Sequence, residues 1–171
     1  GDMGRSYSLD RPVADEVFER FGATLVLAGA AFLLCSLFGL VAGVAAAARQ
    51  YGWTDRIATL LALVGVSTPS FLLGLLLILL FAVRLKWLPA SGMYAIYGGG
   101  DLADLLAHLA LPAVTLAVVA TAVIARLTRA AMLDVLRQDY IRTARAKGLT
   151  ERRVIWRHAF KAALVTVIPV V

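Results

Sequence analysis

The sequence has few charged residues and almost no cysteine. Only 16% of its 171 residues are charged, 61% are hydrophobic and the mean hydropathy is +0.83, a balance that excludes an ordinary soluble domain. The single cysteine, Cys35, lies within an apolar run, so the chain can form no internal disulfide and no cysteine-based metal site. The motifs GxxxxGK[ST], HExxH and GxSxG are also missing, so we expect no catalytic residue, cofactor or metal in this chain.

Long runs without a formal charge divide the chain. A bilayer core requires about 20 helical residues. Three uncharged runs reach this length and predict spanning helices at residues 21–48, 57–83 and 105–125, while a fourth run at 162–171 predicts the start of another span. The expected fold is therefore all-α, a polytopic helical bundle in the membrane with three full spans. Because the chain begins at Gly1 and stops inside an apolar run, we expect it to be part of a longer protein.

Lys and Arg are unevenly distributed between the segments that connect these runs. Residues 49–56 and 126–161 hold 12 of the 17 cations, whereas residues 1–20 and 84–104 hold five. The positive-inside rule then predicts that 49–56 and 126–161 are cytoplasmic and that 1–20 and 84–104 lie on the outer side. Contact with membrane lipid is expected. Nucleic-acid binding is not, because the cations lie between membrane spans and form no recognisable binding module.

The basic segment 126–161 has the pattern of a helix, a turn and a second helix. Apolar residues recur on one side of the first helix, at Leu133, Leu136, Tyr140, Ile141 and Ala144. We expect this helix to end near Lys147, with Gly148 in a left-handed conformation and Thr150 capping a second helix that starts at Glu151. The second helix continues into the fourth apolar run, so motion applied at the turn would reach the membrane as rigid-body motion.

Two stretches resemble known proteins. The run DYIRTARAKGLTERRVIWRHAFKAAL, residues 139–164, resembles the cytoplasmic coupling loop of dipeptide/oligopeptide ABC permeases. The run GVSTPSFLLGLLLILLFAVRLKWLPASG, residues 65–92, is similar to the third spanning helix and following loop of the same permeases. The general pattern of ABC importer permeases, Glu-Ala-Ala followed by three residues and Gly, is matched only at Ala144 and Gly148. The run from Tyr140 to Gly148 follows the peptide-class variant instead.

This resemblance implies a fold, a set of partners and an activity. The fold is that of a type I ABC importer permease, with residues 1–171 forming part of one transmembrane domain in the cytoplasmic (inner) membrane. The implied partners are a second permease subunit, two ABC ATPase subunits that bind ATP and Mg²⁺, and an extracytoplasmic solute-binding protein. The chain would be no enzyme by itself, but would move dipeptides or oligopeptides by alternating access.

Two groups of residues are candidates for this work. The resemblance assigns coupling to the ATPases to Ala144, Arg145, Ala146, Lys147, Gly148, Leu149, Thr150, Glu151, Arg157 and His158. Pro69 frees a backbone carbonyl in the second apolar run, so the polar residues around it either border a translocation path or form a kink whose hydroxyls bond their own helix. These residues are Ser67, Thr68, Pro69 and Ser70.

Three further interpretations concern the solute, the role and the packing. Relatives of this permease class also import nickel, glutathione or oligosaccharides, and a membrane scaffold that merely docks partners is an alternative outside transport. Gly39 and Gly43 form a GxxxG pair with Gly29 nearby, which favours close helix packing in the first span.

Overall fold

The computed structural model describes residues 4, 12–94 and 100–170, and every regular element in these ranges is helical, which confirms the all-α fold. Parts of the predicted outer segments 1–20 and 84–104 lie outside the described residues. Three π-helical or 3₁₀ segments interrupt or extend the α-helices: η1 (Ile78–Arg84), η2 (Val154–Ala159) and η3 (Ile168–Val170). The α-helices are α1 (Val13–Ala48), α2 (Trp53–Ser67), α3 (Ser70–Leu77), α4 (Leu102–Leu136), α5 (Asp139–Ala146), α6 (Glu151–Arg153) and α7 (Phe160–Val167).

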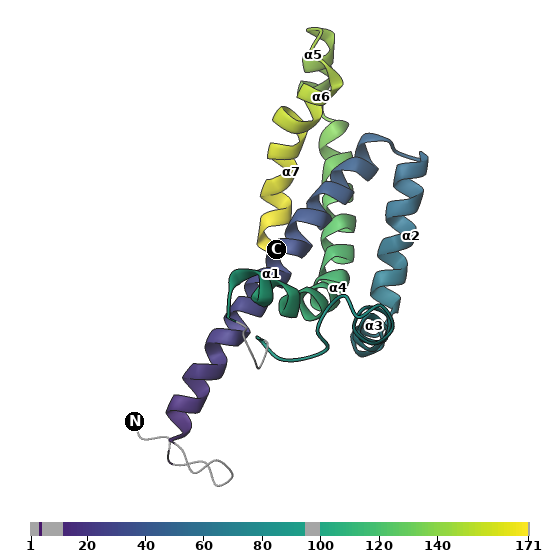
Figure 1. Ribbon diagram of the computed structural model, residues 1–171. Coiled ribbons are helices and arrows are strands. Elements are labelled where there is room, and N and C mark those ends of the chain that lie inside the picture. Colours follow the sequence, from purple (N-terminus) through teal and green to yellow (C-terminus); the bar gives the residue numbers. More distant parts are fainter. Residues whose placement is uncertain (1–3, 5–11, 95–99, 171) are drawn as a thin grey trace.

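Among the described residues, two unbroken helices have the length and composition to cross a membrane. They are α4 and the part of α1 from Glu16 to Ala48. Both extend beyond the predicted spans 21–48 and 105–125, because a helix continues past the apolar run that marks the bilayer core. In Figure 1 the loop before α2 and the helix α5 lie at one end of the bundle, while α3 and the start of α4 lie at the other. Segments predicted to lie on the same side of the membrane thus share one end of the bundle, while the side that each end faces stays a prediction.

The predicted span 57–83 is not one straight helix. Helix α2 ends at Ser67, and α3 with η1 continues at an angle of 102° to it. The break lies at Thr68 because the ring of Pro69 disfavours helical backbone in the preceding residue, and Thr68 is extended with φ −87° and ψ 122°. The Thr68 hydroxyl and amide both donate to the Val64 carbonyl, at 2.8 and 3.0 Å, which satisfies the end of α2.

Helix α4 begins on the predicted outer side with a capping box. The Asp101 carboxylate accepts a hydrogen bond from the Asp104 amide at 2.8 Å, and the Asp104 carboxylate accepts one from the Gly100 amide at 3.2 Å. Pro112 lies inside α4. Figure 1 shows the first turns of α4, drawn in teal, lying across the bundle before the helix turns to run along α2. Proline is the usual cause of such a bend.

Glycine permits close contact between α1 and α4. A Cβ atom at Gly39 would lie 2.7 Å from Ile124 Cγ2, and one at Gly43 would lie 2.5 Å from Thr128 Cβ. The two helices therefore touch through their backbones, which confirms the packing interpretation of the GxxxG pair. Gly29 takes no part in this contact, because a Cβ there would have no neighbour within 4 Å.

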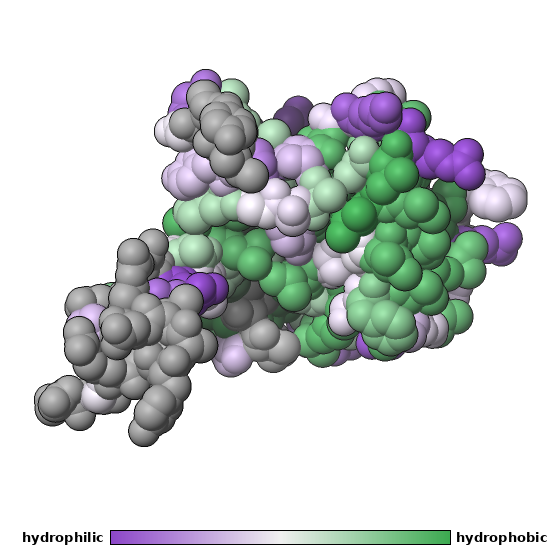
Figure 2. All heavy atoms as spheres, turned by 60° about the horizontal axis from the view of Figure 1, so that its bottom comes forward, coloured by the Kyte–Doolittle hydropathy of each residue, from purple (hydrophilic) through white to green (hydrophobic). Residues whose placement is uncertain are grey.

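The main buried core lies at the predicted cytoplasmic end. It joins residues of α1, α4, α5, η2 and α7: Val44, Ala47, Ala131, Met132, Ile141, Ala144, Val154, Ala159, Ala163 and Val167. A smaller cluster around Cys35, Ala117 and Ile124 lies outside this core, and many other large apolar side chains are exposed. Figure 2 shows hydrophobic residues gathered over a broad area of one face, with hydrophilic residues at its margins. Such a surface suits lipid or neighbouring membrane helices rather than water.

The first helix of the basic segment is not continuous, which corrects our expectation of one helix ending near Lys147. Helix α4 ends at Leu136, Gln138 is extended with φ −69° and ψ 148°, and α5 starts at Asp139. Neither glycine nor proline lies at this break. Tertiary packing explains it, because the change of direction buries Ile141 completely in the same core as Val154.

Candidate coupling site

The turn between α5 and α6 has the geometry expected of a Schellman motif. Gly148 has φ +76°, which confirms its predicted left-handed conformation. Its amide donates to the Arg145 carbonyl at 2.9 Å, and the Leu149 amide donates to the Ala144 carbonyl at 3.4 Å. These bonds satisfy two carbonyls at the end of α5 and reverse the chain within four residues.

A side-chain ion pair on the exposed side of the turn joins α5 to α6. Arg145 donates from Nε to Glu151 Oε1 at 2.7 Å and from Nη2 to Oε2 at 3.4 Å. Helix α6 begins at Glu151 as expected, with Thr150 at the N-cap position. However, the Thr150 side chain makes no capping hydrogen bond, so the predicted cap is wrong in its chemistry. The Arg145–Glu151 pair is the polar side-chain contact that joins the two helices.

The apolar side of the turn is anchored in the cytoplasmic core. Ile141 is fully buried and Ala144 nearly so, and Leu149 packs against the same cluster. The core also contains residues of α1 and α4, including Val44 and Met132. Displacement of the turn is therefore passed to these two long helices through packed side chains rather than through a flexible link.

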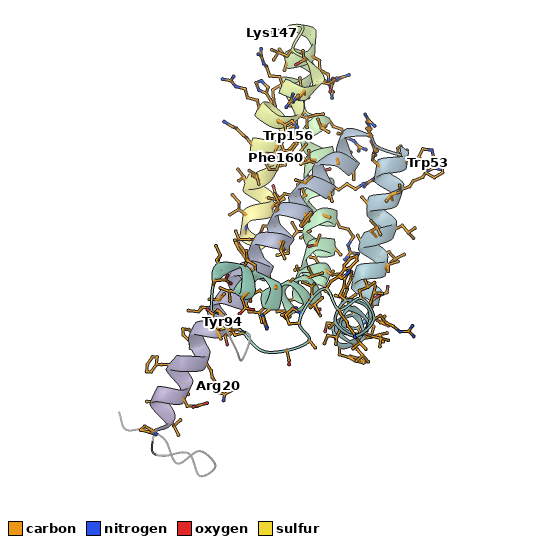
Figure 3. All side chains as sticks on the ribbon, in the orientation of Figure 1. Arg20, Trp53, Tyr94, Lys147, Trp156 and Phe160 are labelled. Carbon is orange, nitrogen blue, oxygen red and sulfur yellow. The ribbon has the colours of Figure 1, made fainter. Side chains whose placement is uncertain are left out.

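The predicted coupling residues divide into four groups, three of which lie at or beside the turn. Arg145, Ala146, Lys147 and Gly148 are exposed at the tip, and Figure 3 shows Lys147 at the far end of the projection. Thr150 and Glu151 are exposed beside them, and Leu149 is half-buried. Ala144 is buried, so it supports the turn and offers no surface to a partner.

The remaining two candidates lie away from the tip. Arg157 is exposed and His158 half-buried on η2, the π-helical segment that leads from α6 into α7. The adjacent rings of Trp156 and Phe160 meet edge to face with centroids 5.3 Å apart, below the tip in Figure 3. A partner that touches Lys147 reaches Arg157 only if it also extends along this helix.

The candidate path residues surround the 102° break. Ser67, Pro69 and Ser70 are exposed and Thr68 is half-buried. The Thr68 hydroxyl bonds its own helix, as the kink interpretation requires. Thr68 also lines an open apolar cavity of about 470 Å³ between α1, α2, α3 and α4, whose walls include Phe38, Leu61 and Val118.

An ion pair between the buried Asp55 of α2 and the half-buried Arg129 of α4 was not anticipated from the sequence. Arg129 donates from Nε to Asp55 Oδ1 at 2.5 Å and from Nη2 to Oδ2 at 2.7 Å. The Tyr51 amide also donates to Asp55 Oδ2, at 2.9 Å. The one available signal was that Asp55 is the single acidic residue in the cationic segment 49–56, at the edge of an apolar run.

No metal site is assembled among the residues that the structure describes, because no three His, Cys, Asp or Glu side chains come together there. His108 faces the capping residue instead: its Nδ1 lies 2.9 Å from the Asp104 carbonyl and 3.2 Å from the Asp104 carboxylate. The arrangement as a whole is suited to transmitting movement between a projecting turn and membrane helices.

Comparison with known proteins places this arrangement in a family context. A family model described as "Binding-protein-dependent transport system inner membrane component" matches residues 39–171. The glutathione transport system permease protein GsiC of Escherichia coli strain K12 is 43% identical to this chain over 168 residues. Its namesakes in Shigella dysenteriae serotype 1 and Shigella flexneri serotype 5b are 43% and 42% identical over the same length.

These alignments cover 98% of this chain and 52% of each relative. The chain thus spans about half the length of the curated relatives it matches. The matches confirm the predicted resemblance to ABC importer permeases of the peptide and glutathione type.

Proposed function

Because this chain belongs to the family of binding-protein-dependent transport system inner membrane components, we propose that it forms part of a permease that imports small peptides. The chain is a multi-pass component of the inner membrane and is not itself the hydrolytic subunit. In the proposed complex it pairs with a second permease subunit, two ABC ATPases that bind ATP and Mg²⁺, and an extracytoplasmic solute-binding protein.

The observation that carries this proposal is the exposed turn at Gly148 on a buried base. Its tip presents Arg145, Ala146 and Lys147 to solvent, while Ile141 is packed into a core shared with α1 and α4. In a structure of this kind, a displacement of the exposed turn is transmitted through the packed core to the spanning helices. Movement of the ATPases on binding ATP would then change which side of the membrane the solute cavity faces.

The class of solute is inferred from the relatives. Their printed names assign them to glutathione transport, and glutathione is itself a modified tripeptide. The resemblance of residues 139–164 to dipeptide and oligopeptide permeases indicates the same chemistry, a short chain with free charged termini. Nickel and oligosaccharides are the competing solutes within this class of importer.

The residues around Pro69 are proposed to border the path. Non-helical backbone at membrane depth is tolerated where it is buried in protein or lines a water-filled cavity. The break at Thr68 lies beside the apolar cavity and exposes Ser67 and Ser70. A solute passing this point would meet hydroxyls and backbone carbonyls in an otherwise apolar wall.

Reconstitution tests the proposed function directly. The full-length permease, its partner permease, both ATPases and the binding protein are placed in proteoliposomes. Uptake of labelled glutathione, a labelled dipeptide, labelled nickel and a labelled oligosaccharide is then measured with and without ATP. We expect ATP-dependent uptake that excess unlabelled peptide inhibits and that nickel or an oligosaccharide does not. Uptake of nickel or oligosaccharide instead would overturn the peptide assignment, and no uptake of any of the four would favour a scaffold.

A further inference from the structure

Asp55 is an unusual residue for its location. Among the side chains whose burial the structure describes, it is the one charged group that is buried, with 4% of its surface exposed. Both of its oxygens accept from Arg129, which lies 74 positions later in the chain. A two-pronged contact of this kind fixes the orientation of the two groups as well as their distance.

The same carboxylate also holds the loop that precedes α2. Tyr51 has φ +62°, a conformation that a residue with a bulky side chain rarely adopts. Its amide is held by Asp55 Oδ2 at 2.9 Å, and the Thr59 hydroxyl lies 3.5 Å from Oδ1. The end of α1, the start of α2 and the cytoplasmic half of α4 are thus tied to one side chain.

Packing around α2 is too open to replace this link. The cavity of about 470 Å³ separates parts of α1, α2 and α4 and is lined by small residues such as Ala58, Ala62 and Ala125. Further along α2, contact with α4 is made at Gly65, where an added Cβ would lie 3.3 Å from Val118 Cγ1. Near its start, α2 meets α4 through small side chains, and the ion pair adds a directional polar link between the two helices.

The pair lies between the two functional regions. Arg129 precedes the end of α4 at Leu136 by seven residues, about 10 Å at 1.5 Å per residue, and α5 follows directly. From Asp55, α2 runs to the break at Thr68 and Pro69 beside the cavity. Displacement of α4 that starts at the coupling turn is therefore transmitted to α2 first through the Asp55–Arg129 ion pair.

We propose that Asp55 and Arg129 are positioning residues that make α2 move with α4, so that displacement of the coupling turn reaches the break at Pro69. This inference rests on the proposed function, because it assumes that the turn is driven by an ATPase. It assigns the pair no contact with solute. Its role is to keep ATP hydrolysis by the partner ATPases coupled to passage of the solute.

The test disrupts the ion pair by substitution and then reconnects α2 and α4 with an engineered disulfide. In a Cys35→Ala background, Asp55→Asn removes the charge, and Arg129→Lys keeps a charge but loses the two-pronged contact. Each is expected to lower glutathione or dipeptide uptake per ATP hydrolysed by about tenfold, within the range typical of coupling between two sites. Arg20→Gln, which breaks the exposed Arg20–Glu16 pair on α1, is the matched control and should leave the ratio unchanged.

A disulfide between α2 and α4 provides the restoring link. A Cβ at Gly65 would lie 3.4 Å from the Cβ of Ala122, close to the separation found in disulfides. Gly65→Cys and Ala122→Cys are added to the Asp55→Asn variant. Oxidation should then restore its uptake per ATP hydrolysed, and reduction of the disulfide should lower that uptake again. A protein that had merely misfolded would not regain activity on oxidation.

Disulfide formation also gives a readout that needs no solute. With Asp55 present, the two thiols should join with equal yield in the nucleotide-free and ATP-trapped complexes, and Asp55→Asn should lower that yield. The inference is overturned if neither variant at the pair changes the uptake ratio, or if oxidation alone blocks uptake. A further outcome is that the complex with Asp55 and Arg129 intact takes up no peptide, while Asp55→Asn still lowers the yield of the Gly65–Ala122 disulfide. In that case the proposed function is wrong, but the inferred link between α2 and α4 holds.

Discussion

Substitution of Gly43 by alanine tests the close contact between α1 and α4. The added Cβ would lie 2.5 Å from Thr128 Cβ, 2.7 Å from the Ala125 carbonyl oxygen and 2.9 Å from Thr128 Cγ2. Carbon atoms in ordinary contact are about 3.5–4.0 Å apart, so α1 and α4 must separate by about 1 Å. Overpacking of this kind typically costs about 1–3 kcal/mol. We expect Gly43→Ala to lower the free energy of unfolding by that amount.

The matched control is Gly29→Ala in the same helix. A Cβ at Gly29 has no neighbour within 4 Å, so only helix propensity acts there, which favours alanine by up to about 1 kcal/mol. Unfolding is followed by tryptophan fluorescence as SDS is titrated into detergent micelles. Adding Thr128→Gly to Gly43→Ala removes two of the three clashing atoms and should recover part of the loss. If Gly43→Ala proves as stable as Gly29→Ala, α1 and α4 are not in backbone contact.

Three further outcomes are expected at the two ends of the bundle. Gly148→Val should insert in the membrane normally but lose ATPase co-purification and uptake, whereas Gly92→Val, which alters a glycine with φ +91° in the predicted outer loop, should keep both. If Gly148→Val retains full uptake and ATPase binding, the turn does not couple. Cysteine at Ser91 should react with an impermeant external thiol reagent, and cysteine at Thr150 only after permeabilisation; the opposite pattern reverses the topology. Cysteine at Ala146 should crosslink to the ATPase with a yield that changes on ATP trapping, and a constant absence of product there argues against docking at the tip.

Local signals in the sequence predicted the features that depend on a few neighbouring residues. Uncharged runs indicated the spanning helices because the cost of burying charge in a bilayer is local to each residue. Gly148 was recognised for the same reason, since a left-handed backbone between two helical patterns needs only one residue. The break at Pro69 was also visible, because proline acts on the residue immediately before it.

Features that depend on distant contacts were missed. The direction of the 102° bend is set by where α3 packs, and a Cβ at Gly74 would lie 3.3 Å from Thr115 on α4. The break between α4 and α5 follows from burial of Ile141, not from a helix breaker. The partner of Asp55 is 74 residues away, so no helical spacing could have paired it with Arg129.

The hydrogen bonds and the ion pair that close the coupling turn join residues within 144–151. The carbonyls of Ala144 and Arg145 are satisfied by Leu149 and Gly148, and the Arg145 side chain meets Glu151. The turn therefore has its shape before any partner arrives. Docking onto such a surface involves little loss of conformational entropy, because few backbone dihedrals remain to be ordered. Most of the free energy of the contacts can then favour docking of the ATPase in one nucleotide state over another.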